Sequence, residues 1–71
     1  MPQMLPVTSS CVASIGYDRR LHELYVEYVE SGVYAYWPVE ESVWQAFLAA
    51  DSKGTFVNEV LKQPRYRFRK T

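Results

Sequence analysis

The chain has 71 residues, eight cationic and eight acidic side chains, one cysteine and one histidine. This length corresponds to one small domain, whose core lies near the lower limit for independent folding. A single cysteine excludes an intrachain disulfide, one Cys with one His disfavours a structural zinc site, and the lack of a run of about 18 apolar residues disfavours a membrane-spanning helix.

The composition also indicates how such a small core finds its stability and where the protein acts. Two tryptophans, six tyrosines and three phenylalanines bury much area per residue. A homodimer would be a further source of stability, so we consider a homodimer beside a monomer. The N-terminus lacks a basic region followed by an apolar stretch, and a lone free thiol suits a reducing compartment. We expect a cytoplasmic protein without signal peptide, membrane contact, metal or cofactor.

The charges divide the chain into two parts. Residues 1–61 carry three cations against eight acids, a net charge of −5, whereas residues 62–71 carry five cations and no acid, a net charge of +5. An anionic partner is therefore expected to contact the C-terminal segment.

In chain order, residues 1–6 contain two prolines and are expected to form a flexible or loosely docked lead-in, so that the core covers about 7–69. Strong β formers predict a first strand over 11–17, and polar residues connect it to a second strand. The stretch 24–37 contains two β-rich runs on either side of a Ser-Gly pair, which is typical of a β-hairpin. Together these runs predict a three-stranded antiparallel meander.

The register of this hairpin decides which side chains share a face. With Ser31 and Gly32 as a two-residue loop, Val29 would lie opposite Tyr34 and Glu27 opposite Tyr36. One face would then be a credible core, formed by Leu24, Val26, Tyr28, Val33, Ala35 and Trp37. The other face would carry three tyrosines beside Glu27 and Val29: Tyr25, Tyr34 and Tyr36.

Beyond Pro38, which ends the third strand, the apolar period changes to that of a helix. The apolar stripe consists of Val39, Val43, Trp44, Phe47 and Leu48. We expect Gly54 to end this helix in a left-handed conformation and Thr55 to cap a second helix that stops at Pro64.

The last segment, residues 65–70, alternates basic with aromatic residues, which predicts an edge strand or an extended arm. The predicted fold class is therefore α+β, a three-stranded antiparallel meander followed by two short helices and a C-terminal edge strand. The chain has no linker and no repeat, so residues 1–71 are expected to form a single domain.

Several segments in this order resemble the KTSC domain, a family named after the C-terminus of some lysyl-tRNA synthetases that also occurs as short stand-alone bacterial proteins. The resemblance spans roughly residues 7–69, and its central mark is a Tyr-x-Tyr motif, here Tyr34 and Tyr36. The matching residues are Ser9-Ser10, Gly16-Tyr17-Asp18, Leu24-Tyr25-Val26, Gly32-Val33-Tyr34-Ala35-Tyr36, Trp44, Ala50-Asp51-Ser52-Lys53-Gly54 and Asn58. The departures are Tyr28 where the family favours Phe, Phe56-Val57 in place of a more aromatic pair, and Lys62-Gln63-Pro64 at the end of the second helix.

This resemblance implies a small bacterial or phage protein without an established activity. RNA binding has been suggested for the family because of its association with a synthetase, which is an association and not a mechanism.

Two groups of residues are candidate nucleic-acid contacts. Tyr25, Tyr34 and Tyr36 would stack bases from one face of the sheet. The tail residues Arg65, Arg67, Arg69 and Lys70 would contact phosphates. The structural alternatives are that a helix or the arm covers the tyrosines and that the arginines only solvate an edge strand. The same aromatic residues could instead form a surface for a protein partner or a second copy.

The sequence offers little support for catalysis. Ser9, Ser10 and Cys11 are nucleophile types, but nothing places His22 beside them and no Gly-rich oxyanion loop is present. The Ser-Lys-Gly-Thr run at 52–55 lacks the frame and the preceding strand of a Walker motif. The sequence thus predicts a non-enzymatic binding module for RNA or single-stranded nucleic acid, with protein interaction or homodimerisation as the alternative.

Overall fold

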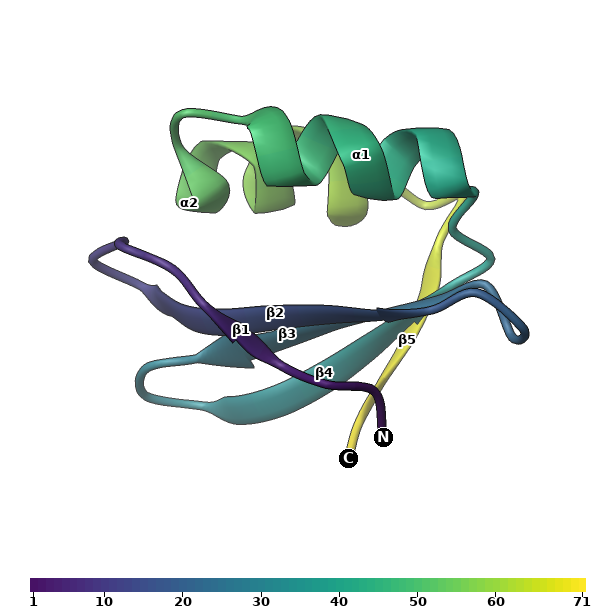
Figure 1. Cartoon of the computed structure of the whole chain (residues 1–71), viewed down its shortest axis with the longest axis horizontal. Helices are drawn as coiled ribbons and strands as arrows, with labels where there is room; N and C mark the ends of the chain where they lie inside the picture. Colours follow the sequence, from purple (N-terminus) through teal and green to yellow (C-terminus); the bar gives the residue numbers. More distant parts are fainter.

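Five antiparallel strands, adjacent in chain order, form one sheet, and two helices cover one of its faces (Figure 1). The computed structural model describes residues 1–71. The strands are β1 (Leu5–Pro6), β2 (Val12–Asp18), β3 (Glu23–Tyr28), β4 (Gly32–Trp37) and β5 (Arg67–Lys70). The helices are α1 (Glu41–Ala49) and α2 (Lys53–Phe56), which continues into a π-helical turn, η1 (Val57–Leu61).

The predicted α+β class and the C-terminal edge strand are confirmed. The expected three-stranded meander is the centre of a larger sheet, because β1 and β5 add one strand at each edge. No helix has both the length and the apolar character needed to cross a membrane.

The N-terminal residues pair with the sheet, so the flexible lead-in expected for residues 1–6 is wrong. Leu5 in β1 lies opposite Ile15 in β2. The residues before β1 cross Gly16, since a Cβ atom there would lie 2.7 Å from the Met4 sulfur and 2.9 Å from the Gln3 carbonyl oxygen. Gly16 therefore lets the chain dock closely on the sheet face that points away from the helices.

The β3–β4 hairpin has a three-residue loop, so the expected two-residue register is wrong. Tyr28 lies opposite Gly32, and Gly32 has a φ of 86°, a conformation that glycine adopts without the steric penalty of a side chain. The register differs from the expected one by three positions, and an odd shift exchanges the two faces of a strand. Tyr34 and Tyr36 therefore point toward the helices, on the side of Tyr28, and Tyr25 points away from them.

The helical layer packs on the sheet through aromatic rings. Trp44 and Phe47 are the buried residues of α1, which confirms the centre of the predicted stripe. The Trp44 ring stacks on Tyr17 of β2 with 5.5 Å between centroids, and Phe47 stacks on Phe56 at 4.8 Å. The buried core consists of Val12, Ile15, Tyr17, Leu24, Val26, Tyr36, Val39, Trp44, Phe47, Val57, Leu61 and Tyr66.

The helix ends differ from the expectation. Gly54 lies inside α2 and is not left-handed, and the acceptors at the end of α1 are satisfied by Lys53, whose ammonium donates to the Ala50 carbonyl at 2.5 Å. Ser52, and not Thr55, is the N-cap of α2, because its Oγ accepts the Thr55 N–H at 3.2 Å.

Candidate functional site

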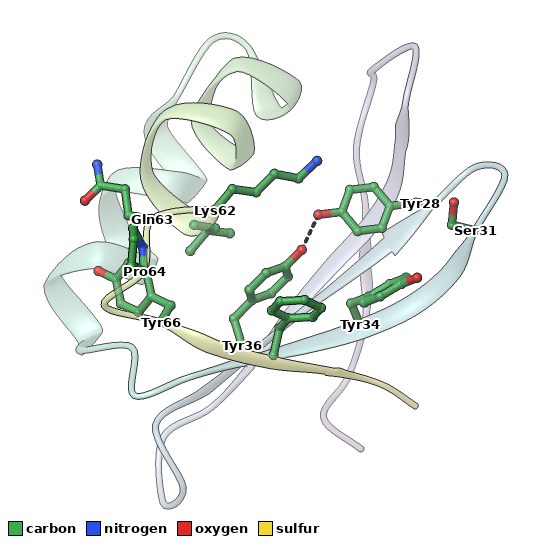
Figure 2. Close-up of a pocket in the computed structure, with 10 residues that line it drawn as sticks. Tyr28, Ser31, Tyr34, Tyr36, Lys62, Gln63, Pro64 and Tyr66 are labelled. Carbon is green, nitrogen blue, oxygen red and sulfur yellow. Dashed lines mark hydrogen bonds between the residues drawn. The ribbon is translucent and has the colours of Figure 1, made fainter.

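A groove of about 530 Å³ opens between the sheet and the segment that joins η1 to β5 (Figure 2). Cavities of this order are typical of sites that hold small ligands. The groove ends at one side on the hairpin residue Ser31 and at the other on Gln63 and Pro64. Its aromatic lining consists of Tyr28, Tyr34, Tyr36, Tyr66 and Phe68.

Three strands and one loop position these rings. β3 contributes Tyr28, β4 contributes Tyr34 and Tyr36 at alternate positions, and β5 places Phe68 directly opposite Tyr36. Tyr66 precedes β5 and is buried. Because side chains alternate along a strand with a period of two, all the strand-borne rings reach the side that the helices cover.

The rings differ in how much surface they offer. Tyr36 is 4% exposed, whereas Phe68 is 64% exposed and Tyr34 is half-buried. The Phe68 centroid lies 6.1 Å from that of Tyr36 and 6.3 Å from that of Tyr34. The tyrosines therefore do not form the open sheet platform expected from the sequence: Tyr36 is the floor of a groove, and Tyr34 and Phe68 supply its accessible ring surface.

The hydroxyl groups of Tyr28 and Tyr36 are polar groups within this aromatic groove. The hydroxyl oxygens of Tyr28 and Tyr36 are hydrogen-bonded at 2.5 Å. Burial raises the pKa of both phenols above the ordinary value, and for Tyr28 the hydrogen bond to Tyr36 raises the pKa further. A phenol with the ordinary pKa of 10 is already protonated at neutral pH, and the upward shift extends this state to more alkaline pH. Both groups can therefore donate and accept hydrogen bonds but are poor proton acceptors for general-base chemistry.

Lysines flank the groove. The Lys62 N–H closes η1 by donating to the Val57 carbonyl at 3.0 Å, an i→i+5 bond, and the Lys62 ammonium lies 6.0 Å from the centroid of the Tyr28 ring. Lys70 in β5 lies opposite Tyr34 and shares its face. Neither lysine has a carboxylate within ion-pair distance, since the ion pairs of the structure involve other residues. The groove therefore combines aromatic walls with unpaired positive charge.

Tyr25 and Arg69 lie on the opposite face of the sheet and belong to a separate polar cluster. The Tyr25 hydroxyl donates to one carboxylate oxygen of Glu23 at 2.7 Å, and Arg69 donates to the other at 3.2 Å. The Arg69 guanidinium also lies 5.1 Å from the Trp37 ring centroid. The hydrogen bonds from Tyr25 and Arg69 lower the pKa of Glu23, and the same bond to Glu23 raises the pKa of Tyr25. This cluster joins β3 to β5 across β4 and does not reach the groove.

The other tail arginines are exposed and carry no ion pair. Arg65 lies before β5 with its guanidinium 5.1 Å from the Tyr66 ring centroid. Arg67 lies opposite Trp37 and shares the outer face with Arg69. Of the seven predicted contact residues, the structure thus brings Tyr34 and Tyr36 into the lining of the groove and places Lys70 beside Tyr34 on the same face, outside that lining. It leaves Arg65 near Tyr66 and places Tyr25, Arg67 and Arg69 on the other face.

Three of the aromatic residues that line the groove, and Lys62, were not among the predicted contact residues. Tyr66 and Phe68 occupy alternate positions of the tail, and this period already indicated a shared face. The assumed register assigned Tyr28 to the core. Nothing in the sequence marks the π-helical turn that brings Lys62 to the groove.

The nucleophile types and the histidine do not form a catalytic pair. Cys11 directly precedes β2 and His22 follows its far end, and a strand of this length spans roughly 20 Å. Ser9 has a structural role, since its Oγ accepts the N–H groups of Cys11 and Val12, both at 3.3 Å. The structure contains no cluster of three or more His, Cys, Asp or Glu side chains that could hold a metal ion.

Comparisons with known proteins identify the family. The KTSC domain matches residues 8–66. The crystal structure of a KTSC domain protein from Yersinia pestis is 40% identical with a TM-score of 0.92, covering 97% of this chain and 96% of that chain. A protein from Tsukamurella paurometabola is 39% identical over 64 residues, which cover 90% of this chain and 94% of the relative, and an uncharacterized protein from Stutzerimonas stutzeri is 42% identical over 60 residues, 84% of each. The chain belongs to the KTSC domain family.

Proposed function

We propose that this KTSC domain is a non-enzymatic cytoplasmic module whose aromatic groove binds single-stranded RNA. One observation carries the proposal: five aromatic rings line a single groove whose flanking lysines, Lys62 and Lys70, have no acidic partner. Aromatic surface that stacks bases, next to cations that contact phosphates, is the combination by which single-strand binders hold a flexible chain. The exposed free thiol of Cys11 favours a reducing compartment such as the cytoplasm.

We propose different tasks for the rings. Phe68 and Tyr34 offer ring surface on which a base can stack, and each such stack contributes about 1–3 kcal/mol. Tyr36 is too buried to stack, so its hydroxyl, together with that of Tyr28, would hydrogen-bond the edge of an inserted base. Since both phenols hold their protons at neutral pH, the groove is suited to recognition and poorly suited to proton abstraction.

The proposal is tested with a labelled single-stranded RNA oligonucleotide, using fluorescence anisotropy at two salt concentrations. We expect saturable binding that weakens with salt, because phosphate contacts release counterions. Phe68→Ser should weaken binding about 5- to 100-fold with only a small loss of stability, since the Phe68 ring contacts Tyr34 and Tyr36 but is largely exposed. Lys62→Ala should reduce the slope of the logarithm of the binding constant against the logarithm of the salt concentration by about one, because one phosphate contact is lost.

Leu21→Ser is the matched control, because Leu21 is a similarly exposed apolar residue, 57% exposed, on the β2–β3 turn. Absence of binding at low salt would contradict the proposal, and so would equal losses for Phe68→Ser and Leu21→Ser. A dimer that forms with concentration and is abolished by Phe68→Ser would assign the groove to contact with a second copy instead.

A further inference from the structure

The outer edge of β5 has no strand beside it. β5 ends the order of the sheet and pairs only with β4, and all four of its residues are exposed. An unpaired edge offers backbone donors and acceptors to any other extended chain, and proteins commonly protect such edges. The helices lie over the face of the sheet (Figure 1), and no proline interrupts β5.

One hydrogen bond shows which backbone groups of β5 are not bonded to β4. The Thr71 N–H donates to the Val33 carbonyl at 2.9 Å, so this pair is a hydrogen-bonded pair of the antiparallel ladder. Because such pairs alternate, Arg69 and Arg67 also direct their N–H and C=O groups toward β4. Phe68 and Lys70 direct theirs away from it, toward the open edge.

The side chains of β5 argue against a second copy of the same strand as the occupant. A two-fold antiparallel pairing must place edge-facing residues opposite edge-facing residues, so it can centre on Phe68 or on Arg69. Arg67 would then lie opposite Arg69 of the other copy, or Arg69 would lie opposite Arg69. Like charges directly opposite each other destabilise a strand pair. An acidic strand would instead place its carboxylates beside Arg67, which has no ion pair within the protein.

We infer that the edge of β5 is a docking site for an acidic, extended segment of another protein, which adds to the sheet as an antiparallel sixth strand. Residues of the segment opposite Phe68 and Lys70 exchange backbone hydrogen bonds with the edge and face the groove side, where an aromatic side chain packs on Phe68. Residues opposite Arg67 and Arg69 face the outer side, where carboxylates meet the guanidinium groups. This site uses backbone groups that the proposed RNA contacts do not need.

The test uses the full chain and a capped peptide, Glu-Val-Glu-Tyr-Glu-Val-Glu, followed by amide NMR. We expect the Phe68 and Lys70 amides to shift and to exchange with solvent at least tenfold more slowly in the complex. A peptide N-methylated at its Val and Tyr residues should lose binding about tenfold or more, because these residues face the edge with their N–H groups. The same peptide N-methylated at its glutamates keeps the edge-facing donors and should bind.

Charge is tested on the protein side with Arg67→Glu, for which we expect at least fivefold weaker peptide binding. Arg65→Glu is the matched control, since Arg65 lies outside β5, and it should have a smaller effect. The inference is overturned if both N-methylated peptides bind alike, if the Phe68 and Lys70 amides stay unprotected, or if these amides become protected by self-association alone. RNA binding is measured separately, without peptide, by comparing Lys62→Ala with the parent protein. Either proposal can then fail without the other.

Discussion

The hydroxyl groups of Tyr28 and Tyr36 share a hydrogen bond of 2.5 Å, although the two residues are four positions apart along the β3–β4 ladder. The two side chains lean toward each other along the sheet and hold both rings on the floor of the groove (Figure 2). Burial raises the pKa of both phenols above 10, so that the bond persists into the alkaline range. The register of one hairpin thereby determines the chemistry of the groove.

Removal of the Tyr28 hydroxyl is the direct test of this bond. Tyr28→Phe keeps the ring but leaves the half-buried Tyr36 hydroxyl without its partner, so we expect the free energy of unfolding at pH 7 to fall by about 1 kcal/mol. The pKa of Tyr28 in the folded protein lies above the ordinary 10, so the unfolded chain releases this proton first and stability falls as pH rises above about 10. Urea unfolding at a series of alkaline pH values should show that the free energy of unfolding falls less steeply with pH in Tyr28→Phe than in the parent protein.

Tyr34→Phe is the control for this measurement. The Tyr34 hydroxyl makes no hydrogen bond within the protein, while its ring packs against that of Tyr28 at 5.5 Å. Its removal should therefore leave the stability at pH 7 nearly unchanged. Equal losses for the two variants would show that the bond between Tyr28 and Tyr36 contributes nothing.

The outer-face cluster of Glu23, Tyr25 and Arg69 makes the stability of the protein depend on pH in the acidic range. The hydrogen bonds from Tyr25 and Arg69 hold the pKa of Glu23 below its ordinary value of 4.5. A lowered folded-state pKa stabilises the protein fully above the unfolded value, and this contribution is lost as pH falls through the folded value. Glu23→Gln should therefore lower the urea midpoint at pH 7, and the difference from the parent protein should shrink below about pH 4. Glu59→Gln, which removes a carboxylate without a side-chain hydrogen bond or ion pair, is the control and should leave the urea midpoint at pH 7 nearly unchanged.

Gly16 is expected to control the docking of the N-terminal residues. In Gly16→Ala, the new methyl group would meet the Met4 sulfur and the Gln3 carbonyl oxygen at less than 3.0 Å, so the segment before β1 must move away. We expect residues 2–4 to become mobile in NMR relaxation, while the amides of β3 and β4 keep their protection.

A chain that lacks residues 2–4 isolates the cause of this effect. Without the docked segment, Gly16→Ala should be neutral or stabilising, because alanine loses less backbone entropy than glycine on folding into a strand. A loss of stability in the shortened chain equal to that in the full chain would show that Gly16 is needed for another reason.

Local patterns predicted most of the secondary structure. The β-rich runs on either side of Gly32, the stripe around Trp44 and Phe47, and the alternation around Phe68 each depend on neighbours a few residues away. They correspond to β3, β4, α1 and β5. The N-terminal strand was missed because Leu5 and Pro6 pair through contacts with residues about ten positions further along the chain.

The groove could not be predicted to the same extent, because it depends on two non-local facts. The Ser-Gly pair is compatible with hairpin loops of more than one length, and the difference moves Tyr34 and Tyr36 from one face to the other. Lys62 and Tyr66 join these rings only because η1 closes with an i→i+5 bond before the chain turns into β5. Helical periodicity carries no signal for such a turn.

The hairpin register can be tested at Gly32, where the space around the residue and its backbone conformation act separately. A Cβ at this position would lie 3.6 Å from the Lys70 side chain, an ordinary contact, so a substitution meets strain only through the φ of 86°. We expect Gly32→Ala to lower the free energy of unfolding by about 1 kcal/mol, because the left-handed region disfavours a Cβ, and Gly32→Asn to lower it less, since asparagine tolerates this region. Urea unfolding of the three proteins measures the order, Gly above Asn above Ala. An Ala variant as stable as the parent would mean that the loop adopts another conformation, and the assignment of Tyr34 and Tyr36 to the groove would fall with it.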